Sequence, residues 1–145
     1  MTTRRKAREV ALQILYKADI SGRTEPFDYS PEMDALKRGT DARAYCETIV
    51  AGTLARTPEL DVVIEGCASR WKVSRMTVVD RNILRLAVFE LAHAPDVPYK
   101  VVIDEAVELA KRYGTGDSPA FINGILDQVH RELNGASASG RILKK

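Results

Sequence analysis

The sequence lacks the features of several protein classes. No run of about 18 uncharged apolar residues occurs, so we expect no membrane-spanning helix. The first residues also lack the uncharged apolar core of a secretory signal. Aromatic residues make up only 6% of the chain, and glycine and proline number 9 and 6. Because alanine, leucine, glutamate, arginine and lysine are plentiful, the composition favours helix over strand.

Cysteine and histidine are equally scarce. Cys46 and Cys67 have no CxxC partner and fall on apolar faces of predicted helices. We therefore favour buried thiols in a reducing cytosol over a disulfide. The two histidines, His93 and His130, lie near the ends of separate predicted helices without metal-ligand spacing. We expect surface or partly buried side chains there and no metal site.

The short motifs of common enzymes are missing. The sequence contains no GxSxG, Walker-type loop, GxGxxG or HExxH, so no catalytic mechanism can be assembled and no cofactor is expected. Asp104 and Glu108 lie one turn apart and could share a proton or bind a cation. A solvated acidic face, with Glu108 beside Lys111 or Arg112, is the interpretation that we favour.

The 145 residues, 45% of them hydrophobic, suffice for one core but not for two ordinary domains. Apolar residues at three- and four-residue steps predict six or seven helices, and no strand pair with a hairpin turn occurs. We therefore expect one all-α domain over residues 1–135 and a flexible basic tail over residues 136–145. One short helix should run from Ser30 to about Arg38.

A strongly apolar helix should lie at the centre of this domain. Apolar residues occur on most of its sides between Ile83 and Leu91, which is typical of a helix surrounded by others. Thr77 and Asp80 precede it at capping-box spacing. We expect the hydroxyl and the carboxylate each to bond to a backbone N–H of the other residue.

The formal charge of +2 is unevenly distributed. Residues 2–16 carry a net charge of +3, the last ten residues carry +3, and the chain between them carries −4. A local basic patch can bind a polyanion even when the net charge is small.

The opening stretch TTRRKAREVALQILY concentrates this charge. Its apolar residues recur at helical spacing, and its bases lie in the first turns, where they oppose the helix dipole. An import presequence, a solvated helix end and a phosphate-binding surface all fit this pattern. The apolar stripe continues as part of a folded domain, which argues against the presequence. The four bases are Arg4, Arg5, Lys6 and Arg8.

A second segment, YGTGDSPAFING, favours the phosphate-binding alternative. Asp117 and Ser118 lie at a predicted helix start, where backbone N–H groups can bind phosphate or base oxygens. Phe121 follows within a turn and could stack on an unpaired base, although a core position fits its pattern better.

Four stretches together resemble the bacterial transcription antitermination factor NusB family. They are ARxxALQxLY from Ala7, DRNILRLAVFEL from Asp80, VPYKVVIDEAVELAKRYG from Val97 and DSPAFINGILD from Asp117. The resemblance runs through nearly the whole chain to Asp127 and is weakest between Ser21 and Trp71.

The resemblance implies a non-catalytic, all-helical protein made of two small packed bundles. It further implies binding of the boxA element of ribosomal RNA leader transcripts together with NusE, which is also a small-subunit ribosomal protein. Other Nus factors and RNA polymerase would be engaged indirectly, in the bacterial cytoplasm. No membrane is involved.

The family's site residues carry over by position. The resemblance assigns RNA contacts to two remote segments, and it places Tyr16 and Asp80 at the NusE interface. Lys6 departs from the family's arginine-rich start, because a point charge replaces a planar guanidinium. Asp117 is unexpected in such a site, since a carboxylate repels phosphate. The RNA-contacting set is Arg4, Arg5, Lys6, Arg8, Gln13, Asp117, Ser118 and Phe121.

Two other interpretations remain open at this point. An rRNA cytosine methyltransferase can carry the same helical domain, but it needs a following α/β domain, and only ten residues follow Gly135. A helical protein-interaction module without an RNA role would use the basic start only for solvation.

Overall fold

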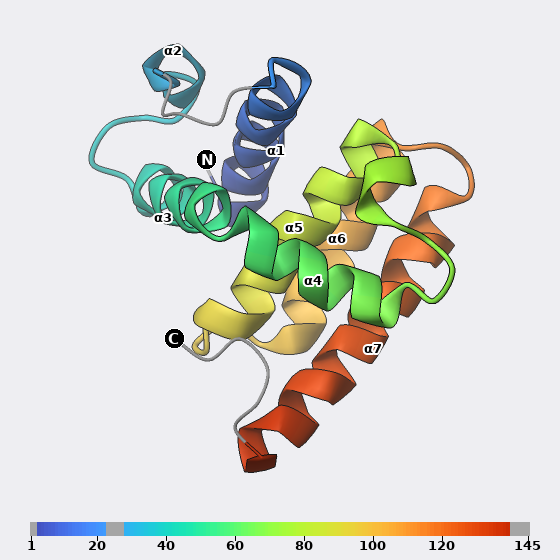
Figure 1. Cartoon of the computed structure of the whole chain (residues 1–145). Coiled ribbons are helices and arrows are strands. Elements are labelled where there is room, and N and C mark those ends of the chain that lie inside the picture. Colours follow the sequence, from blue (N-terminus) through green and yellow to red (C-terminus); the bar gives the residue numbers. More distant parts are fainter. Residues whose placement is uncertain (1–2, 23–27, 140–145) are drawn as a thin grey trace.

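The computed structural model describes residues 3–22 and 28–139, with side chains described as far as residue 135. Within these ranges all regular structure is helical and no strand occurs, which confirms the all-α prediction (Figure 1). The seven α-helices are α1 (Arg4–Ile20), α2 (Ser30–Met33), α3 (Asp41–Ala55), α4 (Thr57–Cys67), α5 (Val78–His93), α6 (Tyr99–Tyr113) and α7 (Ser118–Ser139), and a 3-10 turn, η1 (Val73–Arg75), precedes α5.

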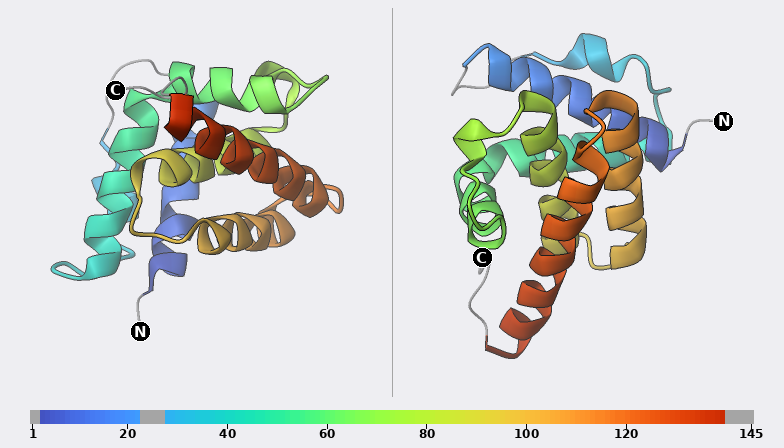
Figure 2. Two further views of the ribbon diagram at one scale, coloured as in Figure 1. Left: turned by 90° about the horizontal axis from the view of Figure 1, so that it is seen from below. Right: turned by 90° about the vertical axis from the view of Figure 1, so that its right-hand side faces the viewer.

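Helix α5 lies at the centre, as its apolar pattern predicts. It packs against α1, α3, α4, α6 and α7 (Figure 2). Helices α1, α2 and α3 pack together on one side, whereas α6 and α7 pair on the other. The buried apolar side chains of both groups form one continuous core. None of the described helices is long and apolar enough to cross a membrane.

Threonine caps define where three of these helices begin. The hydroxyls of Thr3, Thr40 and Thr77 each accept a hydrogen bond from the backbone N–H three residues later. The capping box at α5 forms only half of its predicted bonds. The Asp80 N–H donates to Thr77 Oγ1 at 3.1 Å, but Asp80 Oδ1 is buried without a hydrogen-bond partner.

Two predicted boundaries differ from the structure. Helix α2 ends at Met33 instead of near Arg38, and turns carry the chain to Gly39, whose φ of 79° favours glycine. Helix α7 continues to Ser139, beyond the boundary placed at Gly135. Residues 140–145 of the expected tail lie outside the described residues, so the tail stays a prediction.

Both cysteines are free thiols, as predicted. Cys46 is fully buried, and this burial raises the pKa of its thiol to about 12. Cys67 is only half-buried.

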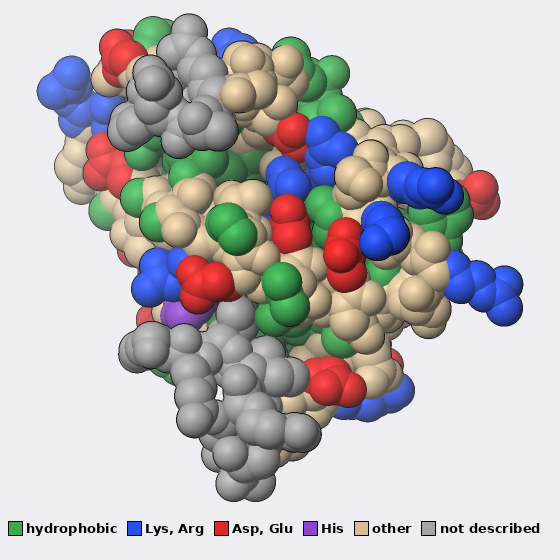
Figure 3. Space-filling view, viewed as in Figure 1, with side chains coloured by type: hydrophobic (Ala, Val, Ile, Leu, Met, Phe, Trp, Pro, Cys, Tyr) green, Lys and Arg blue, Asp and Glu red, His purple; other side chains and the backbone are tan. Residues whose placement is uncertain are grey.

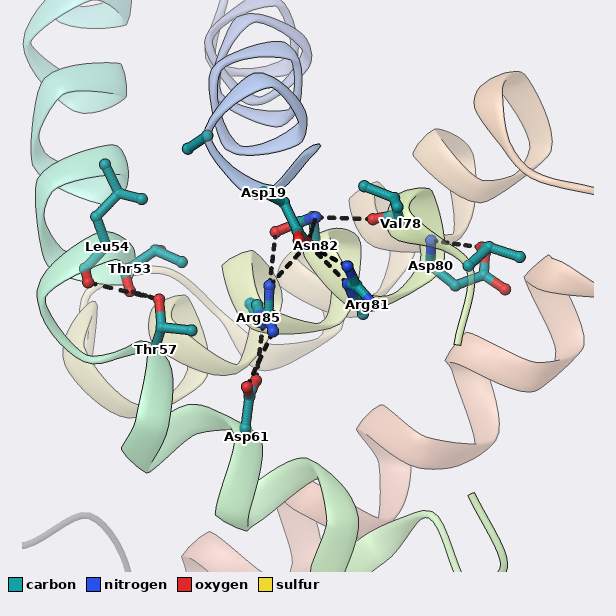
Figure 4. Close-up of polar contacts among 12 residues, drawn as sticks. Asp19, Thr53, Leu54, Thr57, Asp61, Val78, Asp80, Arg81, Asn82 and Arg85 are labelled. Atoms are coloured by element: carbon teal, nitrogen blue, oxygen red, sulfur yellow. Dashed lines mark hydrogen bonds and ion pairs between the residues drawn. The ribbon is translucent and has the colours of Figure 1, made fainter. Parts of the chain in front are cut away.

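Ion pairs fix the C-terminal end of α1 against α5. Asp19 accepts hydrogen bonds from Arg81, Asn82 and Arg85, and Arg85 also binds Asp61 of α4 (Figure 4). Burial alone would raise the pKa of Asp19, but the hydrogen bonds from Arg81 and Asn82 hold it below its ordinary value. The carboxylate therefore stays charged at neutral pH and joins α1 to α5, and Arg85 extends the network to α4.

Candidate nucleic-acid interface

The bases at the start of α1 point in different directions. Successive helical residues are rotated by about 100°, so neighbours in sequence occupy different faces. Arg4 is half-buried, Arg5 and Lys6 are exposed, and Arg8 is buried with only 4% of its surface accessible. The basic run is therefore not one uniform patch.

Arg8 is part of a buried ion pair. Its guanidinium donates to both carboxylate oxygens of Glu90 on α5, with the shortest N–O distance at 2.7 Å. Burial, the largest single effect, lowers the pKa of Arg8, but the hydrogen bonds to Glu90 and the nearby negative charges together raise it overall. The Tyr45 hydroxyl donates to the same carboxylate at 2.5 Å, and burial together with the Glu90 charge raises the pKa of Tyr45. This network joins α1, α3 and α5.

Arg4 lies above the same tyrosine. Its guanidinium carbon is 4.0 Å from the centre of the Tyr45 ring, and its nitrogens bind both oxygens of Asp41 at 2.9 and 3.2 Å. A cation over an aromatic face is attracted by the ring's negative π surface. Arg4 is therefore held by both groups in a fixed orientation.

Arg5 faces α6 on the other side of α1. Its guanidinium binds Glu105 through two bonds of 3.0 and 2.9 Å, and these bonds lower the pKa of Glu105 although burial opposes them. Glu9 lies one turn after Arg5 on α1, and it accepts a hydrogen bond from Arg112 of α6 at 2.6 Å. These groups border a cavity of about 290 Å³ between α1 and α6, and most of the residues that line it are charged.

A second groove follows further along the same two helices. It has a volume of about 390 Å³ and includes Gln13 and Tyr16 of α1 and Tyr113 of α6. Tyr16 and Tyr113 are each 39% exposed. The full lining is Leu12, Gln13, Tyr16, Lys17, Val79 and Tyr113. Asp80, the other residue placed at the partner interface, directly follows Val79 and is 8% exposed.

The turn between α6 and α7 is tightly built. Ser118 Oγ accepts from the Thr115 N–H at 3.0 Å, and Ser118 itself is buried. A Cβ on Gly114 would lie 2.5 Å from Ser118 Oγ, so only glycine fits there. The Ser118 hydroxyl therefore shapes the turn, while the Asp117 side chain is exposed beside it.

Phe121 is partly buried and partly exposed. Its ring is half-buried against the core. It also packs edge-to-face on Trp71, with the ring centres 6.0 Å apart and the planes at 79°. Its remaining exposed surface lies one turn after Asp117.

The structure brings the two predicted segments onto one face. Tyr113 lines a groove with Gln13 and Tyr16, and it directly precedes the turn that carries Asp117. We call this surface, which crosses α1, the end of α6 and the start of α7, the α1–α6–α7 face.

Several residues that organise this face were missed by sequence reasoning. Most are acidic or aromatic partners of the bases, and Arg112 is the partner of Glu9; each lies 37 to 103 residues from the residue that it contacts. Only Glu105 belongs to a feature that the sequence analysis discussed, because it lies in the acidic cluster with Asp104 and Glu108. The partners are Asp41, Tyr45, Glu90, Glu105 and Arg112.

The acidic cluster itself shows the solvated arrangement. Asp104 is exposed, and Glu108 pairs with Lys111 at 3.3 Å. Over the part of the chain that the structure describes, no group of three His, Cys, Asp or Glu side chains could hold a metal ion.

Comparison with protein families gives a match over most of the chain. The model of the NusB family matches residues 5–131. The transcription antitermination protein NusB of Elusimicrobium minutum is 45% identical over 135 residues, which cover 91% of this chain and 96% of that protein. This relative is named a transcription antitermination protein and not an enzyme, which agrees with the prediction of a non-catalytic protein.

Solved structures give the same result. NusB of T. maritima superposes with a TM-score of 0.79 at 35% identity and covers 91% of this chain and 94% of its own. A crystal structure of the antitermination factors NusB and NusE in complex with double-stranded RNA gives a TM-score of 0.76 at 26% identity, over 89% of this chain and 96% of that one.

Proposed function

Because the chain belongs to the NusB family, we propose that it is an RNA-binding transcription antitermination factor. It binds the boxA element of ribosomal RNA leader transcripts together with NusE and supports processive rRNA transcription. NusE is its direct protein partner, and other Nus factors and RNA polymerase are engaged through the complex. Its place of action is the bacterial cytoplasm.

The main support is the α1–α6–α7 face. Arg4 and Arg5 present guanidinium groups in fixed orientations at one end of it, and Lys6 adds an exposed ammonium without an ion pair among the described residues. These bases bind phosphates and supply affinity without sequence preference. Gln13 and the exposed edge of Phe121 bind bases, because an amide can read a base edge and a ring can stack.

Arg8 and Ser118 act on RNA through other residues. Arg8 holds Glu90, which holds the Tyr45 ring below Arg4. Ser118 fixes the turn beside Asp117. The Asp117 carboxylate lies on the RNA surface and weakens phosphate binding there, which limits affinity.

Tyr16 and Asp80 form the contact with NusE. Tyr16 presents an exposed ring in the groove on α1, and Asp80 at the start of α5 directly follows Val79, which lines the same groove.

A titration of a boxA oligonucleotide in the presence of NusE tests the proposal. Arg4→Ala combined with Arg5→Ala should weaken binding roughly tenfold and reduce the slope of log K against log salt by about 1.4, for two phosphates of a single strand. The matched control, Arg56→Ala with Lys100→Ala, removes two bases that have no ion pair among the described residues and should change little. Binding that ignores RNA sequence, salt and NusE would instead favour the helical interaction module.

A further inference from the structure

The segment between α4 and η1 displays the one tryptophan of the chain. Trp71 is 50% exposed, although burial of so large a ring would be strongly favourable. Its backbone N–H donates to the Ala68 carbonyl at 3.2 Å, and Ser69 between them has a φ of 57°. This left-handed conformation is uncommon for a residue with a side chain. The chain therefore turns sharply here and directs the ring outward.

The following residues are firmly anchored. The Val73 N–H donates to Glu65 Oε2 of α4 at 2.7 Å, and the side chains of Val73 and Met76 are buried in the core. On its inner side, Trp71 packs edge-to-face on Phe121. The tryptophan is thus presented by a fixed support and has one face available.

Bases without acidic partners flank this residue in the sequence. Residues 68–79 contain no aspartate or glutamate, and Arg70, Lys72 and Arg75 are all exposed. Among the described residues none of these three side chains forms an ion pair, whereas Arg4, Arg5 and Arg8 each bind a carboxylate. In Figure 3, Lys and Arg side chains gather on the right-hand part of the molecule, where Figure 1 shows the segment between α4 and α5.

This cluster continues the α1–α6–α7 face beyond Phe121. Phe121 belongs to the start of α7, and Trp71 contacts it from the side of α4. An exposed aromatic ring among unneutralised bases is typical of single-strand binding, where bases stack on the ring and phosphates bind the cations. A protein partner fits less well, because three uncompensated cations surround a single apolar group.

We propose that Trp71, with Arg70, Lys72 and Arg75, binds single-stranded RNA next to the segment held at α1 and α7. Trp71 stacks on one unpaired base, and the three cations bind neighbouring phosphates. The inference rests on the proposed function and lengthens its RNA site by a second stacking platform.

The fluorescence of Trp71 provides a direct test, because it is the only tryptophan of the chain. The full chain with NusE is titrated with the boxA oligonucleotide alone and with oligonucleotides extended by several nucleotides at either end. A parallel titration of Trp71→Phe gives the fluorescence of NusE for subtraction. We expect an extended RNA to quench Trp71 and to bind more tightly than the core oligonucleotide.

Charge variants supply the second readout. Lys72→Gln with Arg75→Gln should weaken binding of the extended RNA roughly tenfold and reduce the salt slope by about 1.4, with little effect on the core oligonucleotide. The control Arg56→Gln with Lys100→Gln makes the same charge change elsewhere and should leave both affinities unaltered.

The outcomes separate the two proposals. Tight RNA binding with unchanged Trp71 fluorescence, or equal affinity of the Lys72/Arg75 variant for extended RNA, would overturn the inference and leave the proposed function standing. A change in Trp71 fluorescence on adding NusE alone would make the cluster a protein contact and likewise overturn it. Absence of any RNA binding by the wild-type chain would overturn both.

Discussion

Arg5 and Arg8 are three positions apart on α1, yet their surroundings differ. The Arg8 side chain is 5% exposed and its partner Glu90 is 1% exposed, whereas the Arg5 side chain is 56% exposed. An exposed ion pair contributes up to about 1 kcal/mol, because water screens it. Removing one member of a buried pair leaves an uncompensated charge, which costs about 3–5 kcal/mol.

Glu90→Gln should therefore lower the free energy of unfolding by about 3–5 kcal/mol, since it leaves Arg8 buried without a counter-charge. Arg5→Ala should lower it much less, because water screens the exposed pair. Urea denaturation followed by circular dichroism measures both values. Equal losses for the two variants would contradict the structural role of Arg8 and return it to the group of RNA-contacting bases.

At the scale of elements, the close approach of α3 to α5 depends on one glycine. Gly52 of α3 faces the Phe89 ring of α5, and a Cβ at this position would overlap that ring. Phe89 is 7% exposed and surrounded by the core, so it has little room to move. Helix α3 carries Asp41 and Tyr45, so this crossing also sets the support under Arg4.

Gly52→Ala should destabilise the protein by about 1–3 kcal/mol, because overpacking forces the two helices apart. Gly124→Ala in α7 is the matched control, since nothing lies within 4 Å of its added Cβ. There the change should stabilise the helix by up to about 1 kcal/mol. Thermal denaturation of both variants measures the difference. If Gly52→Ala were as stable as the control, the packing of α3 on α5 would tolerate the added methyl group, and the close approach would not depend on Gly52.

At the scale of the whole molecule, local signals predicted the fold well. Threonine caps and the apolar pattern of α5 depend on neighbours in sequence, and the structure confirms the all-α architecture with α5 at its centre. The end of α2 was wrong because turns, not helix, precede Gly39. Arg8 and Leu12 are four residues apart and therefore lie on the same face of α1. Because Leu12 is buried, the helical spacing already indicated that Arg8 points inward.

The partners of the bases could not be predicted in the same way. The Arg5–Glu105 pair spans 100 residues and the Arg8–Glu90 pair 82 residues, so only the tertiary packing brings them together. The sequence showed a net charge of +3 over residues 2–16. In the folded protein Asp41, Glu90 and Glu105 pair with three of the four bases, so the α1 end of the proposed RNA surface is less positive than its sequence indicates.

This pairing leads to a prediction about affinity. RNA must compete with Glu105 for Arg5, whose two hydrogen bonds to that carboxylate hold it toward α6. Glu105→Gln removes the competing charge and should strengthen boxA binding by roughly fivefold, the equivalent of about 1 kcal/mol for one charge pair in water. The titration with NusE measures the change.

Asp104→Asn is the control for net charge, because Asp104 is the adjacent residue on α6 and has no ion pair among the described residues. Both variants remove one negative charge, but only Glu105→Gln frees Arg5. An equal gain for the two would mean that the overall field of the protein matters and the pair does not. A weaker Glu105→Gln complex would mean that Glu105 orients Arg5 for phosphate, so that its loss costs more in preorganisation than it gains in charge.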